Sequence, residues 1–118
     1  MWINVCLELD VPVITTGIYG AYEVPRFETR AEIRAAQGMG VTVAGMTVVP
    51  EVILANELAI PYACISLVVN PATGLGTELL TMEDINFVIE LGSETVKRIL
   101  SRAAKSLIST LDSESHQI

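Results

Sequence analysis

Short apolar runs alternate along the chain with segments whose apolar residues recur at every third or fourth position. The run at 11–23 is β-branched and aromatic and predicts one or two strands, with a kink or bulge at Gly17 or Gly20. The runs at 41–46 and 62–69 predict buried strands. The segments that follow these runs predict helices. This alternation of strand and helix predicts an α/β fold with a largely parallel sheet and right-handed crossovers.

A capping pattern marks the first predicted helix. Thr29 and Glu32 form the T-x-x-E arrangement, in which each residue satisfies a backbone N–H near the other. The helix is predicted to run from about 30 to 37 and to end at Gly38 and Gly40, because glycine adopts the backbone conformation that stops a helix.

Two further helices are predicted downstream. Pro50 suits the first turn of a helix that ends before the next proline. Thr81 and Asp84 mark the start of a last helix, whose apolar residues keep helical spacing to about residue 110. The polar end of the chain, residues 112–118, is predicted to be a frayed tail beyond a domain that spans residues 1–111.

The composition indicates one small domain with an apolar core. The chain has 118 residues, of which 51% are hydrophobic and 18% charged, and this balance argues against disorder. A mean hydropathy of +0.51 favours strands buried on both faces, or a partner that covers part of the surface. The net charge is −7 and no basic patch stands out, so nucleic acid is a poor candidate partner.

The apolar runs are too short to cross a bilayer, and the first ten residues lack the basic segment of a secretory signal. A cytoplasmic protein without a membrane partner is therefore expected. Cys6 and Cys64 form no C-x-x-C pair and no Cys/His cluster, so no metal site is predicted. Cys64 is expected to be a small buried side chain outside any disulfide.

Three polar segments follow the predicted strands. They are PRFET at 25–29, GMT at 45–47 and NPATG at 70–74. In open α/β sheets, ligands bind at the carboxyl ends of the strands. All three segments are therefore expected to face one crevice.

These segments, in this order, resemble the trimeric purine nucleoside phosphorylase and methylthioadenosine phosphorylase family. The matching text is PRFETRAEIR followed by AGMTVVPEVILANELAIPYACISLVVNPATG, and it covers residues 25–74. In this family, phosphate attacks the anomeric carbon of a purine nucleoside and releases a free purine and a ribose 1-phosphate. The resemblance implies a three-layer fold with a mostly parallel sheet flanked by helices, of which this chain would hold the C-terminal portion.

The resemblance also implies roles for single residues. Phe27 would pack against the purine, and Glu28 would accept a hydrogen bond from the N1–H of the base. Met46 would lie under the ribose, and Thr47 would donate its hydroxyl to phosphate. Asn70, the one residue given a catalytic role, would use its amide at N7 and the 6-substituent, where negative charge develops. Phosphate would be the co-substrate and no cofactor is implied.

Each of these residues also has an ordinary structural role that the sequence leaves open. Phe27 and Met46 could fill a core. Glu28 could favour a helix N-terminus, and Thr47 could cap the helix near Pro50. Asn70 could be a turn asparagine. Arg26, for which no chemistry is expected, should pair with a carboxylate at the surface.

The sequence departs from the family pattern in three ways. Val24 stands where the family has a glycine, and valine resists the backbone conformations that glycine allows. Ile85 stands where many members place a histidine on the ribose 5′-hydroxyl, and His116, the only histidine, lies in the tail. The phosphate-binding loop, arginine and histidine of the family's N-terminal part have no counterpart, so the chain alone is expected to be inactive.

Two hypotheses from different classes follow. In the first, the chain is the base- and ribose-binding portion of a purine nucleoside phosphorylase, or of a methylthioadenosine or methylthioinosine phosphorylase. It would work as a homo-oligomer, a trimer by resemblance, or with a complementing N-terminal fragment. In the second, it is a non-catalytic remnant that serves as a binding or assembly module. A hydrolytic nucleosidase is a third possibility, which Thr47 in its GMT segment makes less favoured than phosphate-dependent cleavage.

Overall fold

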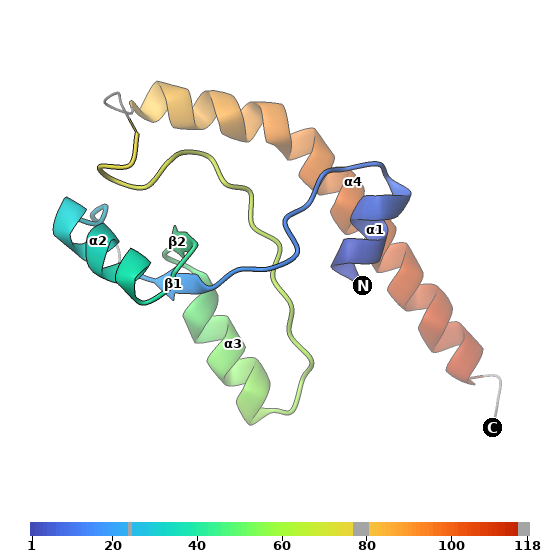
Figure 1. The fold of residues 1–118 in the computed structure, drawn as a ribbon. Helices are drawn as coiled ribbons and strands as arrows, with labels where there is room; N and C mark the ends of the chain where they lie inside the picture. Colours follow the sequence, from blue (N-terminus) through green and yellow to red (C-terminus); the bar gives the residue numbers. More distant parts are fainter. Residues whose placement is uncertain (24, 77–80, 116–118) are drawn as a thin grey trace. The chain divides into compact units, whose positions relative to one another are not determined.

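The computed structural model describes residues 1–23, 25–76 and 81–115. The chain divides into two units. The sheet unit spans Thr16–Ile85, and the helical unit joins Met1–Thr15 to Asn86–Ile118. Figure 1 traces the order of helices and strands along the chain.

The sheet unit contains two parallel strands, β1 (Tyr19–Ala21) and β2 (Val43–Gly45). Tyr19 lies opposite Val43 and Ala21 lies opposite Gly45. The predicted parallel pairing is confirmed, although both strands are shorter than the apolar runs that contain them. The pairing continues through Gly20, and a Cβ there would lie 2.8 Å from a methyl of Val41. Gly20 therefore permits a close approach and does not form a bulge.

Helix α2 (Arg30–Gly38) connects the two strands and has the predicted capping box. The Glu32 N–H donates to Thr29 Oγ1 over 3.2 Å, and the Thr29 N–H donates to Glu32 Oε2 over 2.7 Å. Ile33 and Ala36 are buried one turn apart, which gives the helix its inward face. The helix ends at Gly38, and Gly40 adopts the left-handed conformation with φ of 86°.

Helix α3 (Val48–Glu57) follows β2 directly. Pro50 is its third residue and lies in the first turn, as predicted. The helix ends before Pro61, but none of its residues is buried, and Ile53 and Leu54 are exposed.

The predicted buried strand at 62–69 is wrong in this structure. The segment belongs to no helix or strand, and Leu67 and Val68 are exposed. Cys64, expected to be buried, is also exposed. A strand forms only when a neighbouring strand accepts and donates its backbone hydrogen bonds. In the described part of the chain, β1 and β2 pair with each other and no strand pairs with this segment.

The helical unit contains α1 (Trp2–Glu8), a helix that the sequence analysis missed. It packs beside α4 (Met82–Ser115), and Glu8 forms an ion pair of 2.6 Å with Arg102. The helix can be found in the sequence from apolar residues spaced three or four apart, at Trp2, Val5, Cys6 and Leu9. Val5 and Cys6 are buried.

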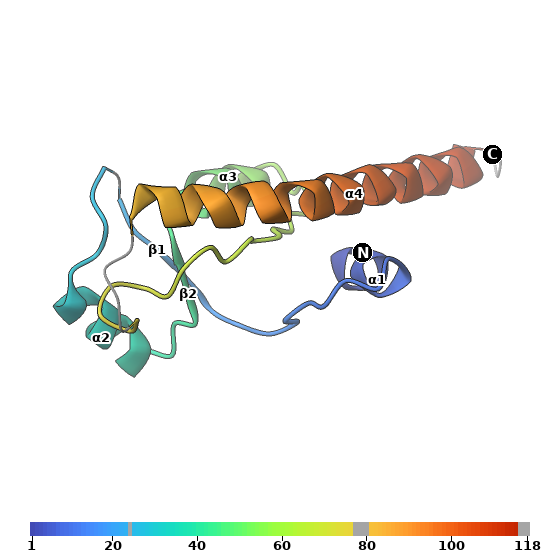
Figure 2. The same ribbon diagram turned by 90° about the horizontal axis from the view of Figure 1, so that it is seen from above.

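Helix α4 begins with the second predicted capping arrangement. The Asp84 N–H donates to Thr81 Oγ1 over 3.2 Å, and the Thr81 N–H donates to Asp84 Oδ2 over 2.9 Å. Figure 2 shows α4 as one continuous helix. It runs to Ser115, so the start of the tail expected to fray is helical, while 116–118 lie outside the described residues. No helix formed by the described residues is long and apolar enough to span a membrane.

Candidate functional site in the sheet unit

The six sequence-predicted site residues all belong to the sheet unit. Phe27 and Glu28 come after β1, while Met46 and Thr47 come directly after β2. Because the two strands are parallel and Ala21 pairs with Gly45, both segments leave the same edge of the sheet. That the two segments face one crevice stays a prediction.

The third segment, NPATG, lies against the first residue of α2, the helix that follows PRFET. It does not follow a strand, but its Gly74 packs against the start of α2. A Cβ built on Gly74 would lie 2.7 Å from Cγ of Arg30, the first residue of α2. Gly74 also has φ of 84°, a conformation that other residues rarely adopt. A glycine is therefore required where this loop meets the helix that PRFET begins.

Phe27 and Glu28 are neighbours with opposite exposure. The Phe27 side chain is 60% exposed, whereas Glu28 is only 8% exposed. Glu28 is the single buried charged residue in the described part of the chain, and no described group donates a hydrogen bond to its carboxylate. Its carboxylate oxygens are not fully enclosed, because Trp2 Nε1 is the only fully buried side-chain polar atom without a partner in the described part of the chain. The arrangement leaves a carboxylate free to accept a donor beside an exposed aromatic ring.

Arg26 and Glu32 fasten the PRFET segment to α2. The two guanidinium nitrogens Nη1 and Nη2 donate to Glu32 Oε2 and Oε1 over 2.9 and 2.7 Å, and Nη1 also donates to the carbonyl of Phe27. This confirms the expected surface ion pair. The hydrogen bonds from Arg26, and then those from the backbone and side chain of Thr29, lower the pKa of Glu32 to about 2. Arg26 is thus a positioning residue for Phe27 and Glu28.

Thr47 occupies the N-cap position of α3 but forms no side-chain capping bond. An N-cap hydroxyl accepts from the second or third helical N–H, and the third residue here is Pro50, which has no N–H. The Thr47 hydroxyl is exposed and stays available. The unpaired N–H groups of the first helical turn lie beside it, and such a helix end favours an anion. Met46, the preceding residue, is half-buried.

Asn70 is half-buried and forms a local hydrogen bond. Its Nδ2 donates to the carbonyl of Pro71 over 2.8 Å, which is the turn role left open by the sequence. The amide would have to exchange this bond to bind a ligand.

Ile85 lies in the first turns of α4 and is 9% exposed. The Thr81–Asp84 box fixes this turn, and the hydrogen bonds from Thr81 lower the pKa of Asp84. Ile85 contributes an apolar side chain without any polar group. Val24, which stands where the family has a glycine, and His116, the only histidine, lie outside the described residues.

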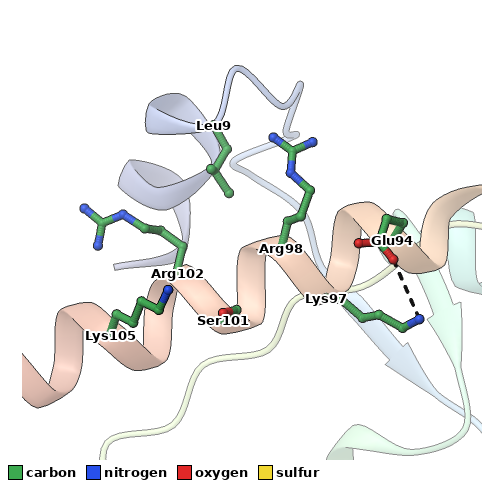
Figure 3. Close-up of a pocket in the computed structure, with 7 residues that line it drawn as sticks. All are labelled: Leu9, Glu94, Lys97, Arg98, Ser101, Arg102 and Lys105. Carbon is green, nitrogen blue, oxygen red and sulfur yellow. Dashed lines mark ion pairs between the residues drawn. The ribbon is translucent and has the colours of Figure 1, made fainter.

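A pocket of about 410 Å³ lies in the helical unit and contains none of the six residues. It is lined by Leu9, Glu94, Lys97, Arg98, Ser101, Arg102 and Lys105 (Figure 3). Four of the chain's seven basic residues line it, so the expectation that the chain has no basic patch is wrong. The spacing of these residues on one helical face was visible in the sequence. Two of them are already paired, Lys97 with Glu94 over 3.8 Å and Arg102 with Glu8.

No group of three or more metal-ligating side chains occurs among residues 1–23, 25–76 and 81–115. The site in the sheet unit instead offers an acceptor at Glu28, an aromatic surface at Phe27, and hydroxyl and N–H donors at Thr47 and the start of α3. Such a set suits a flat, polar organic ligand that carries an anion.

Comparison with protein families gives one match over most of the chain. The model described as the phosphorylase superfamily matches residues 2–105. The match covers the sheet unit in full and also includes α1 and most of α4.

Several curated proteins are similar to the chain. A probable S-methyl-5′-thioinosine phosphorylase of Methanosarcina acetivorans is 46% identical over 89 residues, which are 75% of this chain and 34% of that protein. A probable 6-oxopurine nucleoside phosphorylase of Thermococcus kodakarensis is 40% identical over 85% of this chain and 38% of its own length. The 6-oxopurine nucleoside phosphorylase of Pyrococcus furiosus is 39% identical over 86% of this chain and 38% of its own length. The chain therefore spans somewhat more than a third of the length of these relatives.

Proposed function

The chain belongs to the phosphorylase superfamily, and we propose that it supplies the base- and ribose-binding portion of a purine nucleoside phosphorylase. The reaction would be phosphorolysis of a 6-oxopurine nucleoside to the free purine and ribose 1-phosphate. Phosphate would be the co-substrate, and no cofactor would take part. The names of the similar proteins, which specify 6-oxopurine nucleosides and methylthioinosine, support this choice of substrate class.

The largely buried Glu28 side chain, next to the exposed ring of Phe27, is the observation that carries the proposal. A 6-oxopurine has a hydrogen on N1 and would donate it to Glu28, while Phe27 would cover a face of the ring. Adenine has a bare N1 acceptor, which would face the carboxylate without a proton between them. Leaving a buried polar group unpaired in this way costs roughly 1–3 kcal/mol. The Arg26–Glu32 ion pair would keep both residues in place.

The remaining residues would act on the sugar, the phosphate and the leaving base. The Thr47 hydroxyl would donate to phosphate at the positive end of α3, and Met46 would lie under the ribose. Asn70 would leave the Pro71 carbonyl and bind N7 and the 6-oxygen, stabilising the negative charge that develops as the purine leaves. Phosphorolysis depends largely on positioning the two reactants.

We further propose that phosphorolysis needs the rest of a phosphorylase domain. The family's N-terminal phosphate-binding loop, arginine and histidine have no counterpart in these 118 residues, and the relatives are longer than the chain. The complete assembly would work in the cytoplasm as a homo-oligomer, a trimer in the family. The isolated chain would not release a purine from a nucleoside.

A second substrate is favoured by Ile85. Its side chain is buried and apolar, so the site would gain by burying the sulfur and methyl of a 5′-methylthio group and would offer nothing to a 5′-hydroxyl. This favours methylthioinosine alongside inosine. The name of the Methanosarcina acetivorans relative agrees with this choice.

Calorimetry with free bases tests the proposal at Glu28. The chain would be co-expressed with the N-terminal part of the Methanosarcina acetivorans relative, and hypoxanthine and adenine would be titrated into the complex. Hypoxanthine should bind about 5- to 150-fold more tightly, which corresponds to the cost of an unpaired buried group. Glu28→Gln should narrow this preference, because an amide both donates and accepts. Glu23→Gln, at an exposed neighbouring acid, should not. Equal or tighter adenine binding by the unchanged complex would contradict the proposal.

A further inference from the structure

Two of the four cations that line the pocket of the helical unit have no carboxylate partner. Lys97 and Arg102 are each paired with a glutamate. Arg98 and Lys105 are exposed, and neither forms an ion pair or a side-chain hydrogen bond with the side chains that the structure describes. The exposed hydroxyl of Ser101 is likewise without a hydrogen bond in the described part of the chain. The pocket therefore holds an excess of positive charge and an available hydroxyl, in a chain whose net charge is −7.

These polar groups lie on one face of α4. Arg98, Ser101, Arg102 and Lys105 are spaced by three or four residues, and side chains at this spacing are neighbours on a helix. Figure 3 shows Leu9 pointing onto this face from the end of α1, with Lys105 directed toward Arg102. Like charges at this spacing repel one another and destabilise a helix. An anion placed among them would remove this repulsion.

Arg102 is already held in position. Its Nη1 donates to Ser106 Oγ over 2.7 Å, and its Nη2 pairs with a Glu8 oxygen over 2.6 Å. A guanidinium carries five N–H donors, so further donors remain on this side chain, which is 41% exposed. Because two bonds already fix the guanidinium, it loses little freedom when it binds a ligand.

The charge and size of the pocket specify a phosphate group. A phosphate monoester carries a charge of about −1.5 to −2 near neutral pH, which matches two unpaired cations. Arginine forks fit the oxygens of phosphate, and a hydroxyl adds a further donor. The pocket volume of about 410 Å³ has room for a phosphate with a small organic group. A long polyanion such as nucleic acid is a poor match, because the net charge of −7 repels it.

We propose that Arg98, Ser101, Arg102 and Lys105 bind a phosphate group, either as inorganic phosphate or as the phosphate of a small monoester. This site goes beyond the proposed function. It belongs to the helical unit, whereas Thr47, the residue proposed to hold the phosphate that reacts, belongs to the sheet unit.

A titration of the isotope-labelled chain with inorganic phosphate, followed by the NMR signals of the backbone amides, tests the inference. At physiological ionic strength, the signals of residues 98–105 should move and saturate with one dissociation constant. Arg98→Gln should weaken this binding about tenfold, because a charge-assisted hydrogen bond to the anion is lost, and Lys105→Gln should also weaken it. Arg34→Gln is the matched control, since it removes the same charge from an exposed position on α2 and should leave the constant within about twofold. Circular dichroism checks that the variants fold as the unchanged chain does.

Two further ligands identify the source of the phosphate. Glycerol 3-phosphate is a small phosphate monoester, and succinate carries two carboxylates without a phosphate. Tighter binding of glycerol 3-phosphate than of inorganic phosphate would assign an organic phosphate to the site, and the reverse order would assign free phosphate. Succinate that binds residues 98–105 as tightly as both phosphates would contradict a phosphate site.

Three other results would overturn the inference. They are unchanged signals at 98–105, signals that move there without saturation, and an equal effect of Arg98→Gln and Arg34→Gln. The signals of Thr47 and of the first turn of α3 report separately on the proposed function. Movement at 98–105 alone would support the inference and count against the role proposed for Thr47, whereas movement at Thr47 alone would do the opposite.

Discussion

At the scale of single residues, the sheet unit combines a largely buried glutamate, Glu28, with an ion pair that holds the segment carrying it. Glu28 would recognise the base, and Arg26 with Glu32 would fix the backbone that carries it. Charge pairing at an exposed site contributes modestly to stability, so its main effect here is positional. Ile85, whose side chain is 9% exposed, would replace a polar contact to the sugar by an apolar one.

The pKa of Glu32 gives a prediction for pH. Because the folded state lowers this pKa from 4.5 to about 2, the ionised carboxylate stabilises the fold above pH 4.5, and this stabilisation is lost as the pH falls toward 2. Arg26→Met should reduce the free energy of unfolding at pH 7, and the difference from the unchanged chain should shrink between pH 4.5 and 2. Urea denaturation of both proteins across this pH range measures the difference in their free energies of unfolding. Arg34→Met, at an exposed arginine of α2, should show no such trend. A difference that stays constant with pH would contradict the assignment.

The apolar contact at Ile85 predicts a change in substrate preference. Ile85→His in the complemented enzyme should shift the ratio of kcat/KM values for inosine over methylthioinosine upward by about tenfold, because the imidazole would bind the 5′-hydroxyl. Ile89→His, one turn further along α4 at an exposed position, is the control. An unchanged ratio would mean that Ile85 is not in the sugar pocket.

At the scale of helices and strands, the sequence predicted best those elements whose signals are local. The capping residues Thr29 and Thr81 fixed the starts of α2 and α4, and Pro50 placed the first turn of α3. The segment 62–69 was predicted wrongly because a strand depends on a neighbour that its own residues do not contain. Helix α1 was not predicted, although its apolar residues recur three or four positions apart and two of them, Val5 and Cys6, are buried.

Two glycines allow a matched test of the loop that carries Asn70. Gly74 has φ of 84° and lies against Arg30, so Gly74→Ala should lower the free energy of unfolding by about 1–3 kcal/mol. Gly38 ends α2 with open space where a Cβ would lie, so Gly38→Ala should be neutral or stabilising by up to about 1 kcal/mol. Thermal or urea unfolding of the two variants measures these changes in the free energy of unfolding. Equal effects would show that Gly74 does not constrain the loop.

At the scale of the whole molecule, the chain belongs to the phosphorylase superfamily and spans a little over a third of the length of its relatives. The sequence predicted the family, the parallel pairing of the strands that PRFET and GMT follow, and the exposed apolar surface. The position of Asn70 could not be predicted, because its turn depends on the packing of Gly74 against α2. The basic pocket on α4 was missed because the net charge of −7 obscures a local cluster.

The most direct test of the central claim is release of hypoxanthine from inosine and methylthioinosine, with and without phosphate. The chain alone should release none, and the complex with the complementing part should release it only when phosphate is present. Glu28→Gln should slow the reaction, whereas Glu23→Gln should leave it unchanged. Phosphate-dependent release by the isolated chain, or release by the complex without phosphate, would contradict the account.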